Sequence, residues 1–318
     1  WLPNIIFKTK LILKLLFKTN CCAILHSTTI LLLLYFQNSL LISSDGSYGF
    51  VSERSPCACH TCVADRGNSN WFSERYDPNV PLLLNSTNSV LNANVSRWWK
   101  LFPLFPDKEH YSDTGSDRCR TCAVVGNSGN LLGSKYGSLI DVHDFIMRIN
   151  KGPTEGYEKD VGSKTTHRIV YPESAIDLDN STHLVLLPVK ILDIQWLISA
   201  FTTKNITQTY TEVPSTIKAN KDKVMILHPE FIRYVYDNWA EGHGSYPSTG
   251  FLTLIFALHI CDEVNIFGFG ATSDGIWHHY FEKILTSYDI GIHAGRFENE
   301  TINRLQQENK ILIYKGWP

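Results

Sequence analysis

From residue 119 onward, short apolar runs rich in β-branched residues alternate with longer segments of mixed polarity. Short runs bounded by turn residues are typical of buried strands, and the longer segments are typical of helices that cross over a sheet. This alternation is the pattern of an α/β fold, whose ligands bind at the carboxyl ends of the strands. We predict a mainly parallel sheet flanked by helices, with strands at 123–125, 169–171, 183–188, 223–227 and 264–267 and helices at 231–239 and 249–260.

Residues 57–118 lack this regularity. They contain a predicted helix over 90–101, which includes Trp98 and Trp99. A charged stretch interrupted by prolines follows at 103–117 and has the composition of a surface loop.

An apolar segment precedes the α/β region. No Asp, Glu, Lys or Arg occurs between Lys18 and Asp45, so the apolar run reaches the ~20 residues that cross a bilayer. Basic residues precede it and acidic residues follow it, which places its amino-terminal side in the cytosol. A cleaved signal peptide is the alternative, because polar residues 26–29 interrupt the run. We predict a cytosolic tail that includes 1–20, a transmembrane signal anchor at 21–42, a stem at 43–56 and one lumenal domain at 57–318.

Composition and charge favour a globular domain and exclude a general affinity for nucleic acid. Of the 318 residues, 43% are hydrophobic and 12% aromatic, which is enough for one large core. Lys and Arg number 29 against 31 Asp and Glu, so the net charge of −2 gives no bulk positive field. Sequons for N-glycosylation all follow the anchor, at Asn85, Asn94, Asn180, Asn205 and Asn299.

Six of the eight cysteines also follow the anchor, and an even set in an oxidising lumen can close three disulfides. Two C-x2-C pairs, Cys59 with Cys62 and Cys119 with Cys122, would also suit zinc, although more than fifty residues separate the pairs. The candidate disulfide cysteines are Cys57, Cys59, Cys62, Cys119, Cys122 and Cys261.

A glycine-rich turn follows the first predicted strand. Gly126 and Gly129 allow the backbone to approach a phosphate or a sugar closely, and the next helix would offer free N–H groups. The turn matches neither the G-x-G-x-x-G fingerprint nor a P-loop, so neither a dinucleotide nor ATP is favoured. Asn127 and Asn130 carry amides that could hold a base or a ribose, although an ordinary tight turn would have the same sequence.

Two further segments carry candidate chemistry. Residues 246–250 form a turn before an apolar helix, where Ser248 or Thr249 would cap the helix and its start would attract an anion. His278, His279 and His293 follow a second glycine turn, and a histidine can act as a base on a hydroxyl or as a cation beside a phosphate near neutral pH. Since the first two are adjacent and point to opposite sides, one of them could simply pack. No His-Glu-x-x-His occurs, which excludes that class of metalloprotease.

Together these segments resemble the four sialylmotifs of animal sialyltransferases. The similarity covers residues 119–174, 228–270, 277–281 and 293–298, in the order of the family. It is closest to the β-galactoside α2,3-sialyltransferases that act on Galβ1,3GalNAc, which share further short motifs at 57–62, 71–75, 97–99, 148–151 and 171–174.

The resemblance implies a single-pass type II Golgi membrane protein with one lumenal catalytic domain. The fold it implies is a variant GT-A-like, Rossmann-like one. The implied reaction transfers sialic acid from CMP-sialic acid, with inversion, to the 3-hydroxyl of galactose in galactose-terminated O-glycans or glycolipids. A homodimer is a further assembly to consider. The implied disulfides join Cys57 to Cys62, Cys59 to Cys119 and Cys122 to Cys261.

Site residues follow from the same resemblance. His293 would accept the proton of the galactose hydroxyl as general base, and His279 would hydrogen-bond the departing phosphate. Glu298 does not share a helical face with His293, so we expect a structural or an orienting role for it. Tyr210 and Tyr246 match acceptor-binding positions. The residues that match donor-binding positions, or lie beside them, are Asn127, Ser128, Asn130, Asn150, Ser248, Thr249, Gly250, Gly270 and His278.

No metal or other cofactor is expected. CMP leaves with a single phosphate, so no divalent ion is needed to neutralise a pyrophosphate. Asp177 and Asp179 form a DxD that a metal-dependent glycosyltransferase could use, but both lie in a charged loop beside a sequon.

The sequence differs from the family at positions that are expected to contact the acceptor. Phe102 and Pro103 stand where relatives carry a glutamine that contacts the acceptor, and the segments 99–119 and 282–293 are short. A sialyltransferase with another galactoside acceptor or linkage is therefore one alternative. An inactive lumenal protein that binds glycan or CMP-sugar is another, and the presence of both His279 and His293 argues against it.

Overall fold

The computed structural model describes residues 57–65, 69–88, 101–106, 110–111, 115, 117–271, 278–282 and 293–316. In this part of the chain, no helix combines the length and the apolar character needed to cross a membrane. The predicted cytosolic tail, anchor and stem lie outside the described residues, as do Asn94 and the predicted helix up to residue 100.

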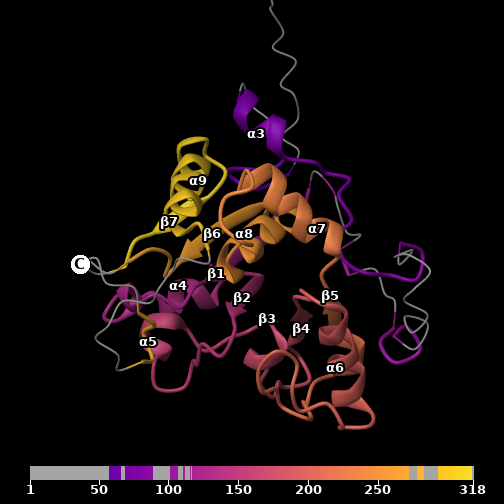
Figure 1. Ribbon diagram of the computed structural model, residues 1–318. Coiled ribbons are helices and arrows are strands. Elements are labelled where there is room, and N and C mark those ends of the chain that lie inside the picture. Colours follow the sequence, from indigo (N-terminus) through magenta and orange to yellow (C-terminus); the bar gives the residue numbers. More distant parts are fainter. Residues whose placement is uncertain are drawn as a thin grey trace, which may run out of the picture. The chain divides into compact units, whose positions relative to one another are not determined.

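A sheet of seven parallel strands organises the described residues, in the order β5-β4-β3-β2-β1-β6-β7. The chain enters at β1 inside the sheet, adds β2 to β5 on one side and then returns to place β6 and β7 on the other (Figure 1). The direction of winding therefore reverses between β1 and β6. The strands are β1 Thr121–Val125, β2 Phe145–Ile149, β3 His167–Val170, β4 His183–Leu186, β5 Val224–Ile226, β6 Glu263–Phe267 and β7 Leu312–Tyr314.

Both faces of the sheet are buried, which explains why its strands read as continuous apolar runs. In β1, Cys122 and Val124 point into one apolar cluster, whereas Ala123 and Val125 point into another on the opposite face. All four side chains are at most 1% exposed.

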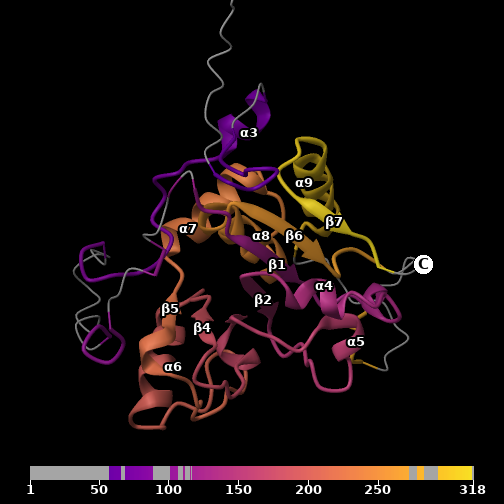
Figure 2. The same cartoon turned by 180° about the vertical axis from the view of Figure 1, so that it is seen from behind.

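Helices cover the two faces in separate groups (Figures 1 and 2). The first face packs against α7 Pro229–Tyr234, the π-helical turn Val235–Trp239, α8 Thr249–Ile260 and α9 Gly295–Gln307. The second face packs against α4 Gly137–Asp141 and α5 Glu158–Val161 beside β1 and β2, and against α6 Ile191–Phe201 beside β4 and β5. Shorter elements are α3 Asn70–Arg75 and the 3-10 turns Gly129–Leu131, Pro172–Ser174 and Lys221–Lys223.

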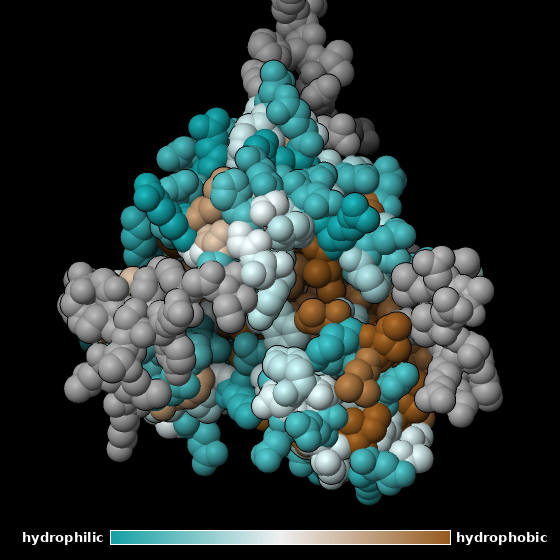
Figure 3. Space-filling model, viewed as in Figure 1, coloured by the Kyte–Doolittle hydropathy of each residue, from teal (hydrophilic) through white to brown (hydrophobic). Residues whose placement is uncertain are grey.

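Helices α8 and α6 differ in how much of their surface is buried. Helix α8 is apolar almost all round and is buried accordingly. Helix α6 buries Trp196 and Leu197 on its sheet side but leaves Ile191 about half exposed at its start. Figure 3 shows the surface of the molecule from the same side as Figure 1. Apolar residues gather in the middle of this surface and over the region of α6, while much of the rest is hydrophilic.

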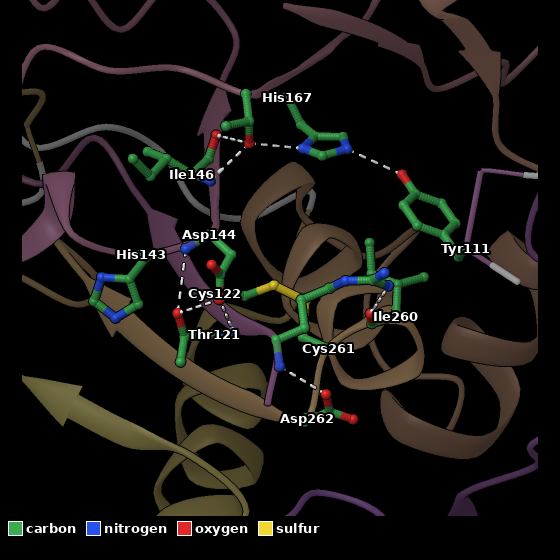
Figure 4. The surroundings of a disulfide bond; sticks show 12 residues. Tyr111, Thr121, Cys122, His143, Asp144, Ile146, His167, Ile260, Cys261 and Asp262 are labelled. Carbon is green, nitrogen blue, oxygen red and sulfur yellow. Dashed lines mark hydrogen bonds between the residues drawn. A yellow bond between two sulfur atoms is a disulfide. The ribbon is translucent and has the colours of Figure 1, made fainter. Parts of the chain in front are cut away.

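Three disulfides join the pairs that the family resemblance implies. Cys57 is bonded to Cys62, Cys59 to Cys119 and Cys122 to Cys261. The last bond ties the middle of the sheet to the end of α8 (Figure 4). The zinc alternative is wrong in this structure, because every cysteine of the two C-x2-C pairs is in a disulfide with a cysteine outside its own pair.

All five predicted strands are present, as are the helices predicted at 231–239 and 249–260, but several elements were not predicted. Strand β2 contains Arg148, which is 2% exposed and donates to the Lys164 carbonyl, so a buried charge interrupts the apolar run. Strand β7 has only three residues at the sheet edge, and α6 and α9 were also missed. The surface-loop prediction for 103–117 is wrong at Phe105, which is 4% exposed and packs edge-on against Phe201.

Candidate active site

The loops that follow β1 and β6 meet at the carboxyl edge of the sheet, where the winding reverses. They approach so closely that a Cβ at Gly126 would lie 2.3 Å from the carbonyl oxygen of Gly268. Gly268 itself has a φ of 69°, in the left-handed region that favours glycine. Open α/β sheets bind ligands in the crevice at this kind of position. A cavity of about 390 Å³ opens here.

The cavity collects residues that are far apart in the sequence. They come from the ends of β1, β2 and β6, from the start of α8, from the 278–282 segment and from α9 and the residues just before it. The predicted site residues that line it are Asn127, Ser128, Asn150, Ser248, Thr249, Gly250, Gly270, His278, His279 and His293.

Asn130, Tyr210 and Tyr246 do not line this cavity. The Asn130 side-chain amide donates to the carbonyl of Phe269 over 2.9 Å, so it braces the β1 loop against the β6 loop. The structure therefore gives Asn130 a contact with protein backbone, whereas the resemblance placed it beside the donor.

Helix α8 begins at the cavity. Ser248 is its N-cap, and the Ser248 hydroxyl accepts a hydrogen bond from the Phe251 N–H over 3.2 Å. Thr249 and Gly250 form the start of the first turn, where backbone N–H groups have no acceptor within the helix. These groups and the helix dipole together favour an anionic ligand at this end.

Glu298 links α9 to this helix start. Its carboxylate accepts both the N–H of Ser248, over 2.7 Å, and the hydroxyl of Ser248, over 2.6 Å. The side chain is buried, and burial raises its pKa above the ordinary value, while the Ser248 hydrogen bonds and the nearby His293 act in the opposite direction. Glu298 thus holds the residue that caps α8.

His293 lies just before α9, and its tautomer follows from its partner. Its Nδ1 is 3.0 Å from the carbonyl oxygen of Tyr246. A carbonyl oxygen can only accept, so Nδ1 carries the hydrogen and Nε2 of the neutral ring keeps its lone pair. The ring of Tyr246 packs edge-on against the imidazole at 4.8 Å, which limits its rotation. The hydrogen bond and the ring contact therefore fix both the tautomer and the orientation of the His293 imidazole.

The 278–282 segment lies along the β1 loop. The Gly129 N–H donates to the His278 carbonyl and the Tyr280 N–H donates to the Asn127 carbonyl. A Cβ at Gly129 would lie 2.1 Å from the His278 ring, so His278 packs directly over the glycine. His279 stacks on Phe281 at 5.1 Å. Both histidines line the cavity, although they are adjacent in sequence.

Glu282 provides a charged partner for His279. Its Oε2 lies 3.0 Å from His279 Nδ1, an ion pair when the imidazole is protonated. This contact holds the imidazole ring of His279 at its Nδ1 side.

A group of tyrosines lies on the other side of the α8 start. Tyr171 is hydrogen-bonded to the Thr249 side chain, and burial raises its pKa. The Tyr210 hydroxyl donates to Glu173, and the Lys190 ammonium lies 3.7 Å from the centre of the Tyr210 ring. Tyr246 lies within electrostatic range of both Tyr171 and Tyr210. The two predicted acceptor residues therefore act on each other electrostatically, although 36 positions separate them in the sequence.

The two aspartates of the DxD serve the loop that contains them. Asp179 accepts hydrogen bonds from Ser181 and Thr182, and Asp177 accepts one from the Lys218 N–H. Within the described ranges, no three His, Cys, Asp or Glu side chains come together as a metal site.

Some residues that line the cavity were missed by reasoning from the sequence. Phe269 lies between the two glycines of a turn that the sequence did single out. Asn299 had been noted only as a sequon, and no local pattern distinguishes Ile302 from other apolar helix positions. Gly295, Asn299 and Ile302 lie four and three positions apart on α9, so a helical projection of that segment would have placed them on one face.

The fold and the cavity define a class of protein. An all-parallel sheet, glycine-rich turns at its reversal point, a helix start suited to an anion and histidines in one cavity are typical of nucleotide-binding α/β group-transfer enzymes.

Comparison with known proteins identifies the family. Residues 65–310 match the family described as "Glycosyltransferase family 29 (sialyltransferase)". This match spans more than half of the chain, and the chain belongs to that family.

Individual relatives agree with this assignment. The chain is 45% identical over 284 residues to the chicken (Gallus gallus) protein named CMP-N-acetylneuraminate-beta-galactosamide-alpha-2,3-sialyltransferase 1, covering 83% of each sequence. It is similar to a solved structure titled "Crystal Structure of a Mammalian Sialyltransferase", with 46% identity, a TM-score of 0.76 and coverage of 82% of this chain and 99% of that one. A second solved structure, of the same kind of protein in complex with Gal-beta-1-3GalNAc-ortho-nitrophenol, has 46% identity, a TM-score of 0.75 and coverage of 82% and 100%.

Proposed function

We propose that the chain transfers sialic acid from CMP-sialic acid to the 3-hydroxyl of terminal galactose in Galβ1,3GalNAc, on O-glycans or glycolipids. The observation that carries this proposal is the cavity in which His293, His279 and the start of α8 converge. The names of the relatives support α2,3 transfer to a β-galactoside, and the ligand in the second solved structure supports Galβ1,3GalNAc as the acceptor.

The donor would lie across the ends of β1 and β2. Asn127 and Asn150 present amides to the nucleotide, and the N–H groups at the start of α8 face the negative charge of the donor. Glycine at positions 126 and 268 leaves room for the two loops to close beneath it.

His293 would act as the general base. The galactose 3-hydroxyl gives its proton to Nε2 of His293 while its oxygen forms a bond to the anomeric carbon of sialic acid. The bond from that carbon to the phosphate oxygen breaks on the opposite face, CMP leaves with the electron pair, and the anomeric configuration inverts. The Nδ1–H bond to the Tyr246 carbonyl stabilises the imidazolium that forms.

His279 would stabilise the leaving group. With Nδ1 beside Glu282, its Nε2–H can donate to the phosphate oxygen as negative charge develops there. Because this group carries a single phosphate, we propose that no divalent metal takes part.

The acceptor would enter on the side of Tyr246. Its ring contacts His293 directly, so a galactose placed on Tyr246 presents its hydroxyl to the base. Tyr210 lies within electrostatic range of Tyr246 and is 64% exposed, which suits contact with a second sugar.

We also propose a Golgi membrane location, with the catalytic domain in the lumen. The support is the apolar segment at 21–42 and the disulfides, which need an oxidising compartment.

The test is a transfer assay with the chain purified in mild detergent, CMP-sialic acid and a panel of galactosides, with and without EDTA. We expect α2,3-linked product on Galβ1,3GalNAc in equal amounts under both conditions. Product only on another galactoside or in another linkage would replace the acceptor assignment. Loss of product in EDTA would contradict the metal-independent step, and CMP binding without any product would indicate an inactive relative.

A further inference from the structure

Arg168, in β3, is a buried cation outside the catalytic residues. It is 5% exposed, and no carboxylate in the described part of the chain forms an ion pair with it. Burial, followed by the charge of Arg148, lowers its pKa to about 10, so the guanidinium remains charged at neutral pH. A buried charge without a partner carboxylate is costly, so the contacts that it makes need an explanation.

Those contacts go to the loop after β2. A single nitrogen, Nη1, donates to the carbonyl of Asn150 over 3.1 Å and to the carbonyl of Gly152 over 2.8 Å. Charged donors form stronger hydrogen bonds than neutral ones. Arg168 therefore clamps both sides of the turn that begins at Asn150.

The clamp determines how Asn150 faces the cavity. Asn150 has a φ of 52°, a left-handed conformation that is unfavourable for most residues. Its N–H donates to the Ile169 carbonyl, its carbonyl accepts from Arg168, and its Oδ1 accepts from the Ser174 hydroxyl over 2.8 Å. Only the Nδ2–H2 group is left, so Asn150 offers a hydrogen-bond donor to the cavity that it lines.

The second amide of the site contacts the same segment. Asn127 Nδ2 donates to the Ile149 carbonyl over 3.1 Å. On the other side of its amide, a Cβ at Gly152 would lie only 2.4 Å from Asn127 Oδ1, so the amide is packed against the Gly152 backbone. Residues 149–152 thus support both asparagines.

We propose that Arg168 is a positioning residue for the donor, acting through the backbone of residues 149–152 to set the amides of Asn150 and Asn127. This inference rests on the proposed function only in naming CMP-sialic acid as the ligand. Arg168 touches neither the cavity nor the reacting atoms, so its effect should appear in donor affinity and not in the chemical step.

The test compares two buried arginines in the full-length protein. Arg168→Met removes the clamp, and Arg168→Lys keeps one charged nitrogen. Arg120→Met is the matched control, because Arg120 is 7% exposed and donates to the Ile260 carbonyl over 2.9 Å. It stands before β1, at the opposite end of the parallel sheet from the cavity. Melting temperature, the Kd for CMP, the KM for each substrate and kcat are measured for every variant.

We expect Arg168→Met to raise the Kd for CMP and the KM for CMP-sialic acid about tenfold or more. The acceptor KM and kcat should change much less, and Arg168→Lys should recover part of the donor affinity. Arg120→Met should lower the melting temperature without this selective change in the donor constants. Equal losses of CMP affinity in Arg168→Met and Arg120→Met, or none in Arg168→Met, would overturn the proposal.

A double-mutant cycle tests whether Arg168 affects CMP binding through Asn150. If Arg168 acts through Asn150, Arg168→Met should weaken CMP binding less in an Asn150→Ala background than in the wild type. Fully additive losses would overturn the mechanism. Failure of the proposed function is a separate result, because a wild-type protein that binds CMP but transfers nothing would still report on this cycle.

Discussion

His293 and Glu298 lie five positions apart around the start of α9, but their hydrogen bonds give them different tasks. His293 bonds to the Tyr246 carbonyl through Nδ1, which leaves Nε2 for the proposed reaction with substrate. Glu298 uses both oxygens on Ser248 and so faces the protein. The hydrogen-bond partners of single atoms therefore separate the proposed base from a residue that supports the protein.

Replacing His293 tests the base. We expect His293→Ala to lower kcat by about 10²- to 10⁴-fold, since that is the usual contribution of general acid–base catalysis. The Kd for CMP should stay near the wild-type value, because the proposed donor contacts are on other residues. Calorimetry and an initial-rate assay measure the two quantities, with exposed His60→Ala as control. Wild-type turnover in His293→Ala would rule out this base.

Replacing Glu298 tests the support of the α8 start. In Glu298→Gln, an amide NH₂ replaces one acceptor oxygen, so one of the two Ser248 donors loses its bond. We expect the free energy of unfolding to fall by about 1–3 kcal/mol and the donor KM to rise. Chemical denaturation and initial rates give both values. Glu300→Gln, on the same helix with an exposed side chain paired to Arg296, should change neither, and an equal effect there would contradict the assignment.

At the scale of elements, β3 and β4 begin with a pair of stacked histidines. The rings of His167 and His183 lie 4.6 Å apart, and the His167 Nε2 is 3.0 Å from the Tyr111 hydroxyl. This cluster lies at the amino ends of the strands, away from the cavity at their carboxyl ends. It couples the stability of the sheet to pH without touching the candidate site.

Burial, followed by the nearby Lys223, lowers the pKa of His183 to about 4. Burial also lowers the pKa of His167. The folded protein therefore holds these rings neutral, while the unfolded chain takes up protons near pH 6.5. The contribution of these neutral rings to the free energy of unfolding is fully present above that pH. It is lost as the pH falls from about 6.5 towards 4.

Urea denaturation of wild type and His183→Gln between pH 4.5 and pH 7.5 measures this effect. We expect a shallower dependence of the unfolding free energy on pH in His183→Gln. If the pH dependence in His183→Gln equals that in the wild type and in the control His60→Gln, the stacked pair has no such role.

Sequence patterns predicted α8 and β1 well, because each is a long or continuous apolar run bounded by glycine or serine turns. They did not predict β2, whose buried Arg148 has the local signature of an exposed position. A buried charge needs hydrogen-bond partners, and Arg148 finds one in the backbone carbonyl of Lys164. That contact forms only in the folded protein. They also did not predict that the helix over 231–239 changes to π-helical geometry at Val235.

At the scale of the whole molecule, the disulfide between Cys122 and Cys261 closes a separation of 139 residues, whereas Cys57–Cys62 closes only 5. A cross-link over a longer loop removes more entropy from the unfolded chain. Replacing both Cys122 and Cys261 by Ala should therefore lower the free energy of unfolding by about 2–5 kcal/mol.

The matched variant replaces both Cys57 and Cys62 by Ala. It should lower the free energy of unfolding by a smaller amount. Differential scanning calorimetry of the two double variants measures the comparison. An equal or larger loss in the Cys57 and Cys62 variant would show that chain entropy does not dominate.

Several properties follow from the sequence by itself. The alternation of apolar runs predicts the parallel α/β sheet, the order of the sialylmotifs identifies the family, and the glycine turns point to the ends of β1 and β6. These are local or linear features, so the order of residues is enough to recognise them.

Only the tertiary structure decided which residues meet. The reversal of winding between β1 and β6 brings Asn127 and His293 to one cavity. Their separation in the sequence gives no sign that they lie close together in space. The tautomer of His293, the two bonds of Glu298 and the clamp from Arg168 to residues 150 and 152 all depend on backbone carbonyls or a helix start supplied by other elements. Hydrogen bonds are short and directional, so such partners are fixed only when the packed elements hold them in place.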